Sequence, residues 1–467
     1  MTNITVLDNA ELKMTAEDVA MLQALYSRSG DSVTGHLEKV KNTGSGNFMK
    51  SYYVGYGHRS IGDCGTTTIF IEGVSSLAAK AIQDNKLYRG QETSSRYVSF
   101  ENQPIFDPIK TEDSKQIIVQ WMMLYKMYLP RVIEGLKAKH PLASYDTTET
   151  IWLNTISAKA FDICRGFLPV GMTTQLSWHT DLRQASDKCF KLLNHPLKEI
   201  RDLAFEILTQ LTIKYPSSFD EKRINNHIDH YSIKGRYAFE IAAKENYLDL
   251  NLRDFGQQIV TEEAPILKWT DNIDVEELNL NEINILRSRP KGMELPKYLE
   301  KYGTVNIKYS LDWGSFRDIQ RHRDCTNQIP LVKSVNPNFL QMNNWYIAGV
   351  EDALGNTFDE IEVERFQGQL ERAQLNTMSF INDVNIYDAQ YFYPFGTQVL
   401  CELNLSIPEL VYIYELRSSQ MVHPTLRNVV KHFKDILRNL IPTIALYGDS
   451  RDDEFSVKRG TQTIKEK

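Results

Sequence analysis

The sequence lacks the signals of a secreted, membrane-spanning or nucleic-acid-binding protein. It has only five cysteines, an odd number with no CxxC pair, which argues against a disulfide framework or a zinc site. No stretch approaches the roughly 18 apolar residues of a membrane span, and residues 1–22 lack the basic start and apolar run of a signal peptide. The formal net charge of −7 argues against a general nucleic-acid binder, which would carry a basic excess. These absences predict a soluble cytoplasmic protein with no metal site and with neither nucleic acid nor membrane as partner.

Helical periodicity dominates what is present. The chain has 467 residues, and its 42% apolar content is enough to bury a core in each of two or three domains. Apolar positions three and four residues apart predict helices over 114–139, 197–213 and 425–441. The β-branched run at 65–72 predicts a strand that leads into a helix at 73–82.

A weak internal repeat divides the chain into two halves. Each half has an apolar segment that ends in proline, Phe167-Leu-Pro169 in the first and Tyr391-Phe-Tyr-Pro394 in the second, followed by a pair of amphipathic helices. A polar, charge-rich segment between the halves is the expected connection, and the C-terminal residues are expected to form a frayed tail. The predicted domains are 1–215, a connecting and helical segment at 216–299, a more diverged domain at 300–445, and the tail at 446–467.

The first candidate binding segment is 89–97, Arg-Gly-Gln-Glu-Thr-Ser-Ser-Arg-Tyr, which follows a helix that ends at Gly90. Phosphate recognition uses these group types, because the planar guanidinium of Arg96 can donate two hydrogen bonds and Ser94 adds a hydroxyl donor. Glu92 would repel a phosphate, so we expect it to accept a hydrogen bond from a sugar hydroxyl. The alternative is a solvated loop with an incidental surface arginine.

Around this segment, Glu72–Val98 resembles the signature of the ThyX family of flavin-dependent thymidylate synthases. That signature runs from Glu-Gly-Val-Ser into Arg-His-Arg-x-x-Ser-x-x-x-x-Ser-x-Arg. Its end is intact here as Ser94-x-Arg96, with Glu92 at the family's nucleotide-contacting glutamate. Its start is lost, because residues 84–86 read Asp-Asn-Lys where the family has Arg-His-Arg.

Further positions of the first half extend the resemblance. Arg165, in Arg-Gly-Phe-Leu-Pro, falls at a nucleotide-phosphate position of the family. Asp181 and Arg183 fall at flavin-contacting positions, and Asp181 departs from the family's asparagine. His58 and Ser60 also match flavin-site positions, although His58 could instead be a turn histidine held by a structural hydrogen bond.

The second candidate segment is 317–323, Arg-Asp-Ile-Gln-Arg-His-Arg, whose three consecutive basic groups would not pack into a core unpaired. Taken alone, it could be a solvated basic turn. In context it resembles the opening of the same signature, with Arg321, His322 and Arg323 as the basic triplet. The end of the signature is replaced here by Ile329, Leu331 and Lys333.

The losses in the two halves are complementary. Arg417 matches the family's base-contacting arginine, whose position in the first half is Leu192, whereas Gln390 replaces the phosphate-site arginine in the second half. ThyX enzymes are homotetramers whose sites combine several subunits, so the resemblance implies one composite site per chain and a homodimer that imitates the tetramer. Arg417 and Arg321 are the predicted catalytic residues. The predicted substrate contacts are Glu92, Ser94, Arg96, Arg165 and Arg417, and the predicted flavin contacts are His58, Ser60, Asp181, Arg183, Arg321, His322 and Arg323.

The resemblance implies both a fold and a reaction. The fold is α/β, with two ThyX-like domains that each pack a mixed sheet against long helices. The reaction is C5-methylation of a pyrimidine nucleoside monophosphate, with dUMP to dTMP favoured, methylenetetrahydrofolate as carbon donor, FAD as cofactor and NADPH as electron source. Methylation of UMP or another pyrimidine nucleotide is the alternative within this class. A catalytically inactive nucleotide-binding homologue, acting as a sensor or partner protein, is the alternative outside it.

Overall fold

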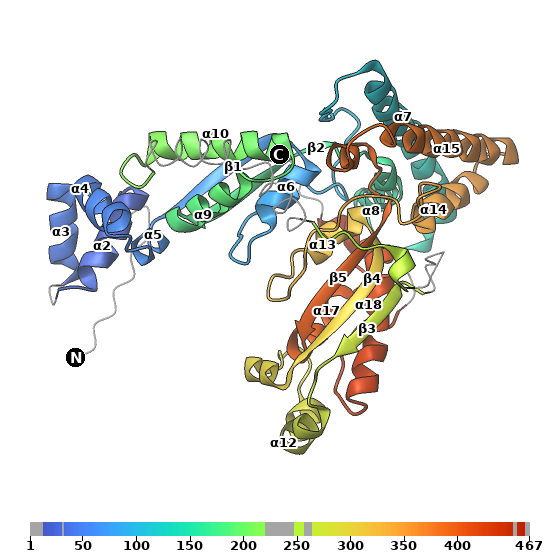
Figure 1. Cartoon of the computed structure of the whole chain (residues 1–467). Coiled ribbons are helices and arrows are strands. Elements are labelled where there is room, and N and C mark those ends of the chain that lie inside the picture. The colour runs from blue at the N-terminus through green and yellow to red at the C-terminus, as the bar shows by residue number, and fades with distance from the viewer. Residues whose placement is uncertain (1–12, 30–31, 220–246, 256–263, 452–454, 463–467) are drawn as a thin grey trace. The chain divides into compact units, whose positions relative to one another are not determined.

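The computed structural model describes residues 13–29, 32–219, 247–255, 264–451 and 455–462 (Figure 1). The chain divides into two compact units, each of which joins segments that are far apart in the sequence. Unit 1 comprises residues 1–72, 81–92 and 175–245, and unit 2 comprises residues 73–80, 93–174 and 246–467. Unit 2 therefore contains parts of both predicted halves. The domain boundaries drawn from the sequence stay a prediction.

Unit 1 contains a group of N-terminal helices and the larger parts of two paired strands. α2 (Ala16–Tyr26) begins with a capping box, in which Thr15 and Asp18 each bond the other's backbone N–H. β1 (Thr66–Ser75) pairs with β2 (Thr173–Asp181). The other elements of unit 1 are α3 (Val33–Thr43), α4 (Gly46–Phe48), the π-helix η1 (Met49–Gly55), α5 (Ser60–Asp63), α9 (Leu182–Leu192) and α10 (Lys198–Lys214). The helix α6 (Ser76–Gln83) is divided, with residues 76–80 in unit 2 and 81–83 in unit 1.

Long helices pack together in unit 2. Thr111 caps the N-terminus of α7 (Glu112–Lys139), and its side chain accepts a hydrogen bond from a backbone N–H of the first turn. Acidic residues follow in that turn, where the helix dipole favours negative charge. α8 (Glu149–Cys164), α14 (Asn344–Gly355) and α15 (Glu360–Ile381) contact α7. The fully buried Trp121 donates its indole N–H to Thr377 Oγ1 at 2.9 Å, which satisfies its one polar atom.

A three-stranded antiparallel sheet forms the other part of unit 2, with β4 (Thr304–Asp312) between β3 (Ile266–Asp271) and β5 (Gln398–Ser406). Apolar residues alternate along β4 and stand opposite apolar residues of β5, as in the pairs Val305–Leu405, Ile307–Leu403 and Leu311–Val399. α18 (Pro424–Leu440) lies against β4 (Figure 1). The remaining elements are η2 (Leu142–Ser144), η3 (Arg165–Phe167), η4 (Leu252–Phe255), α12 (Val275–Ser288), η5 (Lys297–Tyr302), α13 (Trp313–Ile319), α16 (Ile386–Ala389), η6 (Gln390–Phe392), α17 (Ile407–Arg417) and η7 (Val457–Gln462).

The same order of elements occurs twice along the chain. A strand and short helix, then long helices, a 3-10 turn, a strand and two further helices run from β1 to α10 and again from β4 to α18. Within unit 2, the segments that follow η3 and η6 exchange backbone hydrogen bonds reciprocally. The four bonds, each 2.8 Å long, run from Val170 N to Tyr393 O, Gly171 N to Tyr391 O, Phe395 N to Leu168 O and Gly396 N to Gly166 O. Such an exchange is the pattern that a two-fold, isologous interface produces between identical subunits.

The α/β class and the predicted elements are confirmed. The helices predicted at 114–139, 197–213 and 425–441 are α7, α10 and α18, and the strand and helix predicted at 65–82 are β1 and α6. The sheet type differs from the prediction of a mixed sheet, because β3, β4 and β5 pair antiparallel. β4 and β5 are joined through α13 to α16, and of these helices α14 and α15 pack on α7.

Residues 457–462 pack against α8, where the sequence predicts fraying. η7 lies against α8, and its Arg459 pairs with the buried carboxylate of Asp162. A Cβ at Gly460 would lie 2.0 Å from the carbonyl oxygen of Ile151, so only glycine allows this close approach. A buried ion pair and a close backbone contact therefore hold this segment.

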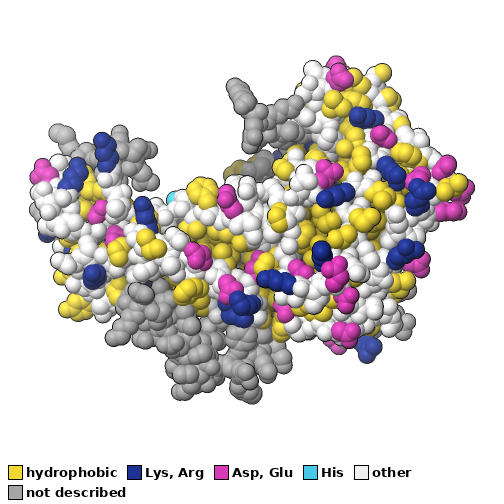
Figure 2. All heavy atoms as spheres, turned by 90° about the horizontal axis from the view of Figure 1, so that it is seen from above, with side chains coloured by type: hydrophobic (Ala, Val, Ile, Leu, Met, Phe, Trp, Pro, Cys, Tyr) yellow, Lys and Arg dark blue, Asp and Glu magenta, His cyan; other side chains and the backbone are white. Residues whose placement is uncertain are grey.

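Charge is mixed over the surface. On the face that Figure 2 shows, Lys and Arg side chains are interspersed with Asp and Glu, in keeping with the formal net charge of −7. Among the described residues, none of the helices combines the length and apolar character that crossing a membrane requires.

Gly135 sets how closely α7 and α14 approach, because a Cβ there would lie 2.0 Å from the carbonyl oxygen of Ala353. We expect Gly135→Ala to destabilise the fold by about 1–3 kcal/mol, as overpacking does, and to lower the thermal unfolding midpoint. Gly368→Ala in α15 is the matched control, because a Cβ there meets nothing within 4 Å. Its better helix propensity should stabilise by up to about 1 kcal/mol. A rise in both midpoints would contradict the close contact.

Candidate functional site

Seven of the twelve predicted site residues lie in unit 2, on elements from both predicted halves. Arg165 starts η3 directly after α8, the triplet 321–323 follows α13, and Arg417 ends α17. Ser94 and Arg96 occupy a turn in which Ser94 Oγ accepts the Arg96 N–H at 3.3 Å. The fold thus gathers residues of both candidate segments into one unit.

Asp318, in α13, is the point where these arginines converge. Its carboxylate lies 3.9 Å from Arg165 Nη1 and 3.7 Å from Arg321 Nη2. Arg417 Nη2 donates to the backbone carbonyl of Asp318 at 3.0 Å. Burial would raise the pKa of Asp318, but Arg321, Arg165, Arg96 and Arg417 outweigh it and hold the pKa below its usual value. Arginines from both halves therefore surround one carboxylate.

Asp162, in α8, is fully buried and holds two arginines. Arg96 reaches it with two prongs, Nε to Oδ1 at 2.8 Å and Nη2 to Oδ2 at 3.1 Å, and Arg459 pairs with Oδ2. Burial opposes the charge of Asp162, yet Arg459 and Arg96 hold its pKa well below the usual value. Arg96 Nη1 donates to the Met421 carbonyl at 3.2 Å. The guanidinium of Arg96 is therefore fixed in orientation by protein atoms on three sides.

Cations outnumber carboxylates in this cluster. Five guanidinium groups lie around Asp162 and Asp318, those of Arg96, Arg165, Arg321, Arg417 and Arg459. Asp312 adds at most one more negative charge, because burial raises its pKa despite the neighbouring Arg165. The five cations thus exceed these carboxylates by at least two charges. Arg96, Arg165 and Arg459 are buried or nearly so, where charges are normally paired, whereas the side chain of Arg321 is 53% exposed and water solvates its charge. An anionic ligand would supply the missing pairing.

A pocket of about 390 Å³ opens beside the cluster. The basic triplet 321–323 and Arg417 line it, together with the exposed ring of Tyr412 and the carboxylates of Glu300 and Glu409. Guanidinium donors, carboxylate acceptors and an aromatic ring face one space. This lining suits a polar, planar ligand that both donates and accepts hydrogen bonds.

His322 fixes the direction of Arg417. Its Nε2 accepts a hydrogen bond from Arg417 Nε at 2.8 Å, which requires that this ring nitrogen carry no proton. Burial, reinforced by Arg417 and Arg323, lowers the pKa of His322 to about 3, so the ring is neutral at physiological pH. The ring and the Asp318 carbonyl together hold the guanidinium of Arg417 in one orientation at the pocket.

Sequence reasoning missed several residues that organise the cluster. Ser315 Oγ accepts from Arg165 Nη2 at 2.9 Å and lies 2.7 Å from Thr425 Oγ1. Asp318 lies inside the basic segment 317–323, and a single acidic residue among basic ones could have indicated an ion-pair partner for them. Asp162 and Arg459 lie 297 residues apart, and no local pattern could have paired them.

Asp181 and Arg183, two of the predicted flavin contacts, lie in unit 1 and have protein partners. Asp181 caps α9 and accepts the Gln184 N–H at 2.8 Å. Arg183 Nε pairs with Asp63, and its Nη1 lies 3.5 Å from Asp187. Both side chains therefore have a structural role that needs no ligand.

His58, Ser60 and Glu92 also lie in unit 1. His58 and Ser60 are exposed at the start of α5, and Glu92 accepts a hydrogen bond from Gln83 Nε2 at 2.8 Å. The structure thus distributes the predicted flavin contacts over both units. In the described part of the chain, no three His, Cys, Asp or Glu side chains are grouped so as to hold a metal ion.

Comparison with known proteins gives one family and several relatives. Residues 12–217 match the family model described as thymidylate synthase complementing protein. A UPF0159 protein of Chlamydia pneumoniae is 24% identical over 80% of this chain and 75% of its own length. A UPF0159 protein of Thermoplasma acidophilum is 21% identical over 92% of this chain and 94% of its own length. A relative from Chlamydia muridarum is 23% identical over 61% of each chain. The likeness to the two longer-matching relatives extends well beyond the family region.

Asp162→Asn would leave Arg96 and Arg459 without a counter-charge in a buried place. We expect a loss of about 3–5 kcal/mol in the free energy of unfolding, measured by chemical denaturation, as for other broken buried pairs. Asp352→Asn is the control, because Asp352 pairs with Lys139 at 2.8 Å on the exposed surface, where removal costs at most about 1 kcal/mol. Equal losses in the two variants would contradict the role of Asp162.

Stability should fall as the pH drops below about 6.5, the ordinary histidine pKa. Burial lowers the pKa of His195 and His322 to about 3 and holds that of His423 well below its ordinary value. Below pH 6.5 these histidines are protonated in the unfolded chain but stay neutral in the folded chain. Each histidine therefore lowers the free energy of unfolding by up to about 1.4 kcal/mol per pH unit. The thermal unfolding midpoint should be lower at pH 5.5 than at pH 7.5, and the difference between the two midpoints should be smaller in His423→Asn. The same drop in that variant would argue against His423 as a source.

Proposed function

We propose that the chain is a flavin-dependent methylase of a pyrimidine nucleoside monophosphate, with dUMP as the favoured substrate, because residues 12–217 match the family model described as thymidylate synthase complementing protein. That match supports a thymidylate synthase-like enzyme at the coarser level. The reaction adds the methylene carbon of methylenetetrahydrofolate to C5 of the pyrimidine and displaces the C5 proton. A bound flavin would supply the hydride that turns the methylene into a methyl group, and NADPH would supply the electrons.

The observation that carries this proposal is the cation excess around Asp162 and Asp318. Five guanidinium groups face two or three carboxylates, so a dianion such as a phosphate monoester would balance their charge. A planar guanidinium binds phosphate with two parallel hydrogen bonds. Arg165, with Ser94 at the neighbouring turn, is the proposed phosphate contact. Arg96, whose guanidinium is held in place by Asp162, would add positive charge beside that phosphate.

Arg417 is the proposed catalytic cation, with Arg321 beside it. C5 of a uracil ring becomes nucleophilic when negative charge that develops on the ring carbonyls is stabilised. A guanidinium held in advance by His322 and the Asp318 carbonyl can do this without reorganising during the reaction. Burial lowers the pKa of Arg417, although Asp318 opposes the shift, and an arginine stays charged at neutral pH.

The residues of unit 2 fit a flavin ring. Arg321 and Arg323 offer guanidinium donors for ring carbonyls and nitrogens, and Tyr412 offers an aromatic face in the same pocket. A bound flavin would supply the hydride, whereas the protein positions it and excludes competing reactions. Glu300 and Glu409 can accept hydrogen bonds from sugar hydroxyls, which both a nucleotide and a flavin chain carry.

A second candidate, a nucleotide-binding protein without catalysis, is favoured by one specific observation. Asp181 and Arg183, at flavin-contacting positions, are engaged as a helix cap and in ion pairs with Asp63 and Asp187. If those positions do not contact a cofactor, the same cation cluster would still hold a nucleotide. The choice between dUMP and UMP depends on the contact at the sugar 2′ position.

Titration calorimetry with dUMP tests the proposed site. We expect one dUMP per chain, and affinity at least tenfold weaker in Arg165→Lys and in Arg417→Lys, because lysine cannot replace the two-pronged guanidinium. Arg438→Lys is the control, since Arg438 lies on α18 and bonds the exposed Pro442 carbonyl at 2.7 Å. Two dUMP per chain, or unchanged affinity in either site variant, would contradict the single cation cluster as the nucleotide site.

The absorption spectrum of the same protein separates the two candidates. A flavin spectrum that NADPH bleaches, with dTMP formed from dUMP and methylenetetrahydrofolate, would establish the methylase. Stoichiometric dUMP binding by protein that neither carries nor takes up FAD would instead establish the non-catalytic nucleotide-binding protein.

A further inference from the structure

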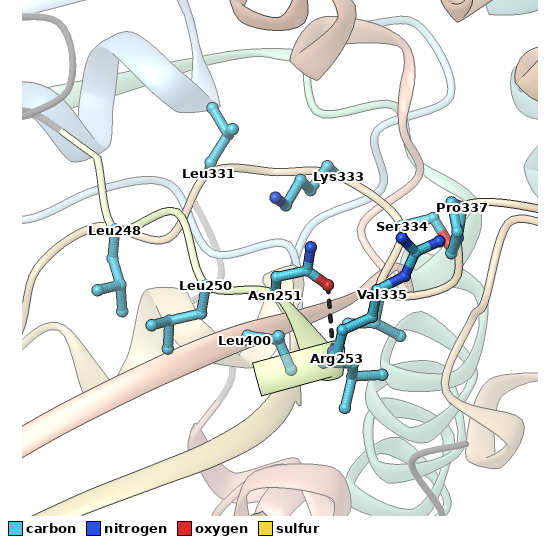
Figure 3. A pocket seen from close by; sticks show the side chains of 11 residues that line it. Leu248, Leu250, Asn251, Arg253, Leu331, Lys333, Ser334, Val335, Pro337 and Leu400 are labelled. Atoms are coloured by element: carbon cyan, nitrogen blue, oxygen red, sulfur yellow. Dashed lines mark hydrogen bonds between the residues drawn. The ribbon is translucent and has the colours of Figure 1, made fainter. Parts of the chain in front are cut away.

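A second pocket, of about 290 Å³, lies elsewhere in unit 2 (Figure 3). Its walls are the segment 248–253, the loop 331–337 and Leu400 of β5. This volume is room for about ten water-sized atoms, at the small end of ligand sites.

The loop 331–337 occupies, in the second set of elements, the place that 94–100 occupies in the first. Both loops follow a short helix and run into long helices, and the family signature aligns Ser94 with Leu331 and Arg96 with Lys333. The hydroxyl has become a buried leucine, 4% exposed, while a cation is retained. The equivalent of the phosphate-binding turn has therefore become more apolar without losing its positive charge.

The segment 248–253 encloses this turn. Leu248 N donates to Ile329 O at 2.8 Å and Leu331 N donates to Leu248 O at 2.9 Å, so the segment runs beside the loop as an added strand. It brings Leu250 and Leu252 to the pocket. With Leu331, Val335 and Leu400 these leucines form an apolar floor, and Leu252, Val335 and Leu400 belong to one buried cluster.

Polar groups gather at one side of this floor. Figure 3 shows the amine of Lys333 directed toward Asn251, and the guanidinium of Arg253 close to Ser334. Lys333 also pairs with Asp249, which keeps the amine in place beside the pocket. Arg253 is exposed, and no ion pair of it occurs among the described residues. The pocket thus combines an apolar floor with two cations and two uncharged hydrogen-bonding side chains.

We propose that this pocket binds a small amphipathic anion, with an apolar body on Leu250, Leu331 and Leu400 and a carboxylate or phosphate on Arg253 and Lys333. It is a site distinct from the nucleotide site, formed where the second copy of the binding turn lost its hydroxyl and kept its charge. A nucleotide does not suit it, because the floor offers a base or sugar no polar partner.

Titration of the full chain with octanoate, octyl phosphate and 1-octanol tests the proposal. At least one of the two anions should bind at least ten times more tightly than 1-octanol. The anion that binds more tightly shows whether the site prefers a carboxylate or a phosphate. Arg253→Gln should weaken that anion about tenfold and leave 1-octanol unchanged. Arg287→Gln, an exposed arginine on α12, is the matched control and should change neither. Val335→Phe should weaken the binding of all three probes by filling the floor. Because Val335 belongs to a buried cluster, its thermal midpoint is measured to check that the variant is folded at the assay temperature.

Three results would overturn the proposal: no binding of either anion, equal affinity for 1-octanol and the anions, or unchanged anion affinity in Arg253→Gln. Weakened anion binding in Arg417→Lys would also overturn it, because the anion would then occupy the nucleotide site. Binding of dUMP should not change in Arg253→Gln, so the amphipathic site and the proposed nucleotide function can fail separately.

Discussion

Two buried carboxylates, Asp162 and Asp318, organise the arginines on which the rest of the site depends. Each takes partners that lie far apart in the sequence: Asp162 binds Arg96 and, from η7 in the predicted tail, Arg459, while Asp318 faces Arg165 of the first half and Arg321 of the second. A guanidinium is costly to bury alone, and its charge can be held in the interior only where paired groups define its direction. Because the carboxylates are fewer than the arginines, the same contacts that fix the cations leave positive charge for a ligand. Stability and binding thus arise from one arrangement.

The reciprocal backbone exchange after η3 and η6 explains how one chain can build this arrangement. In a symmetric dimer, identical segments would make the bonds that link Leu168 with Phe395 and Val170 with Tyr393. Here the two partners are different segments of one chain, so each is free to change by itself. Arg165 stands where the other copy has Gln390, and Gln390 instead accepts a backbone N–H from Val332. One copy has an arginine, the proposed phosphate contact, and the other has a glutamine with a structural role.

Because the two copies can change independently, the signature positions have different roles in the two halves. The triplet 321–323 and Arg417 line a pocket, whereas Asp181 and Arg183 serve a helix cap and surface ion pairs. The turn at 331–333, equivalent to the proposed phosphate-binding turn at 94–96, borders an apolar cavity. The second pocket therefore depends on residues other than those of the proposed nucleotide and flavin site.

The sequence by itself determined the elements and the chemical types of the site. Apolar periodicity located α7, α10 and α18, and the motif residues located both candidate segments, since these signals lie in neighbouring residues. Only the tertiary structure decided that Arg96 is held by Asp162, that Arg417 is aimed by His322, and that η7 supplies Arg459. Such pairings join residues far apart in the chain, and their energies come from burial, which no local pattern records. The antiparallel sheet and the packed C-terminal segment belong to the same class, because strand neighbours and buried ends are chosen by the whole fold.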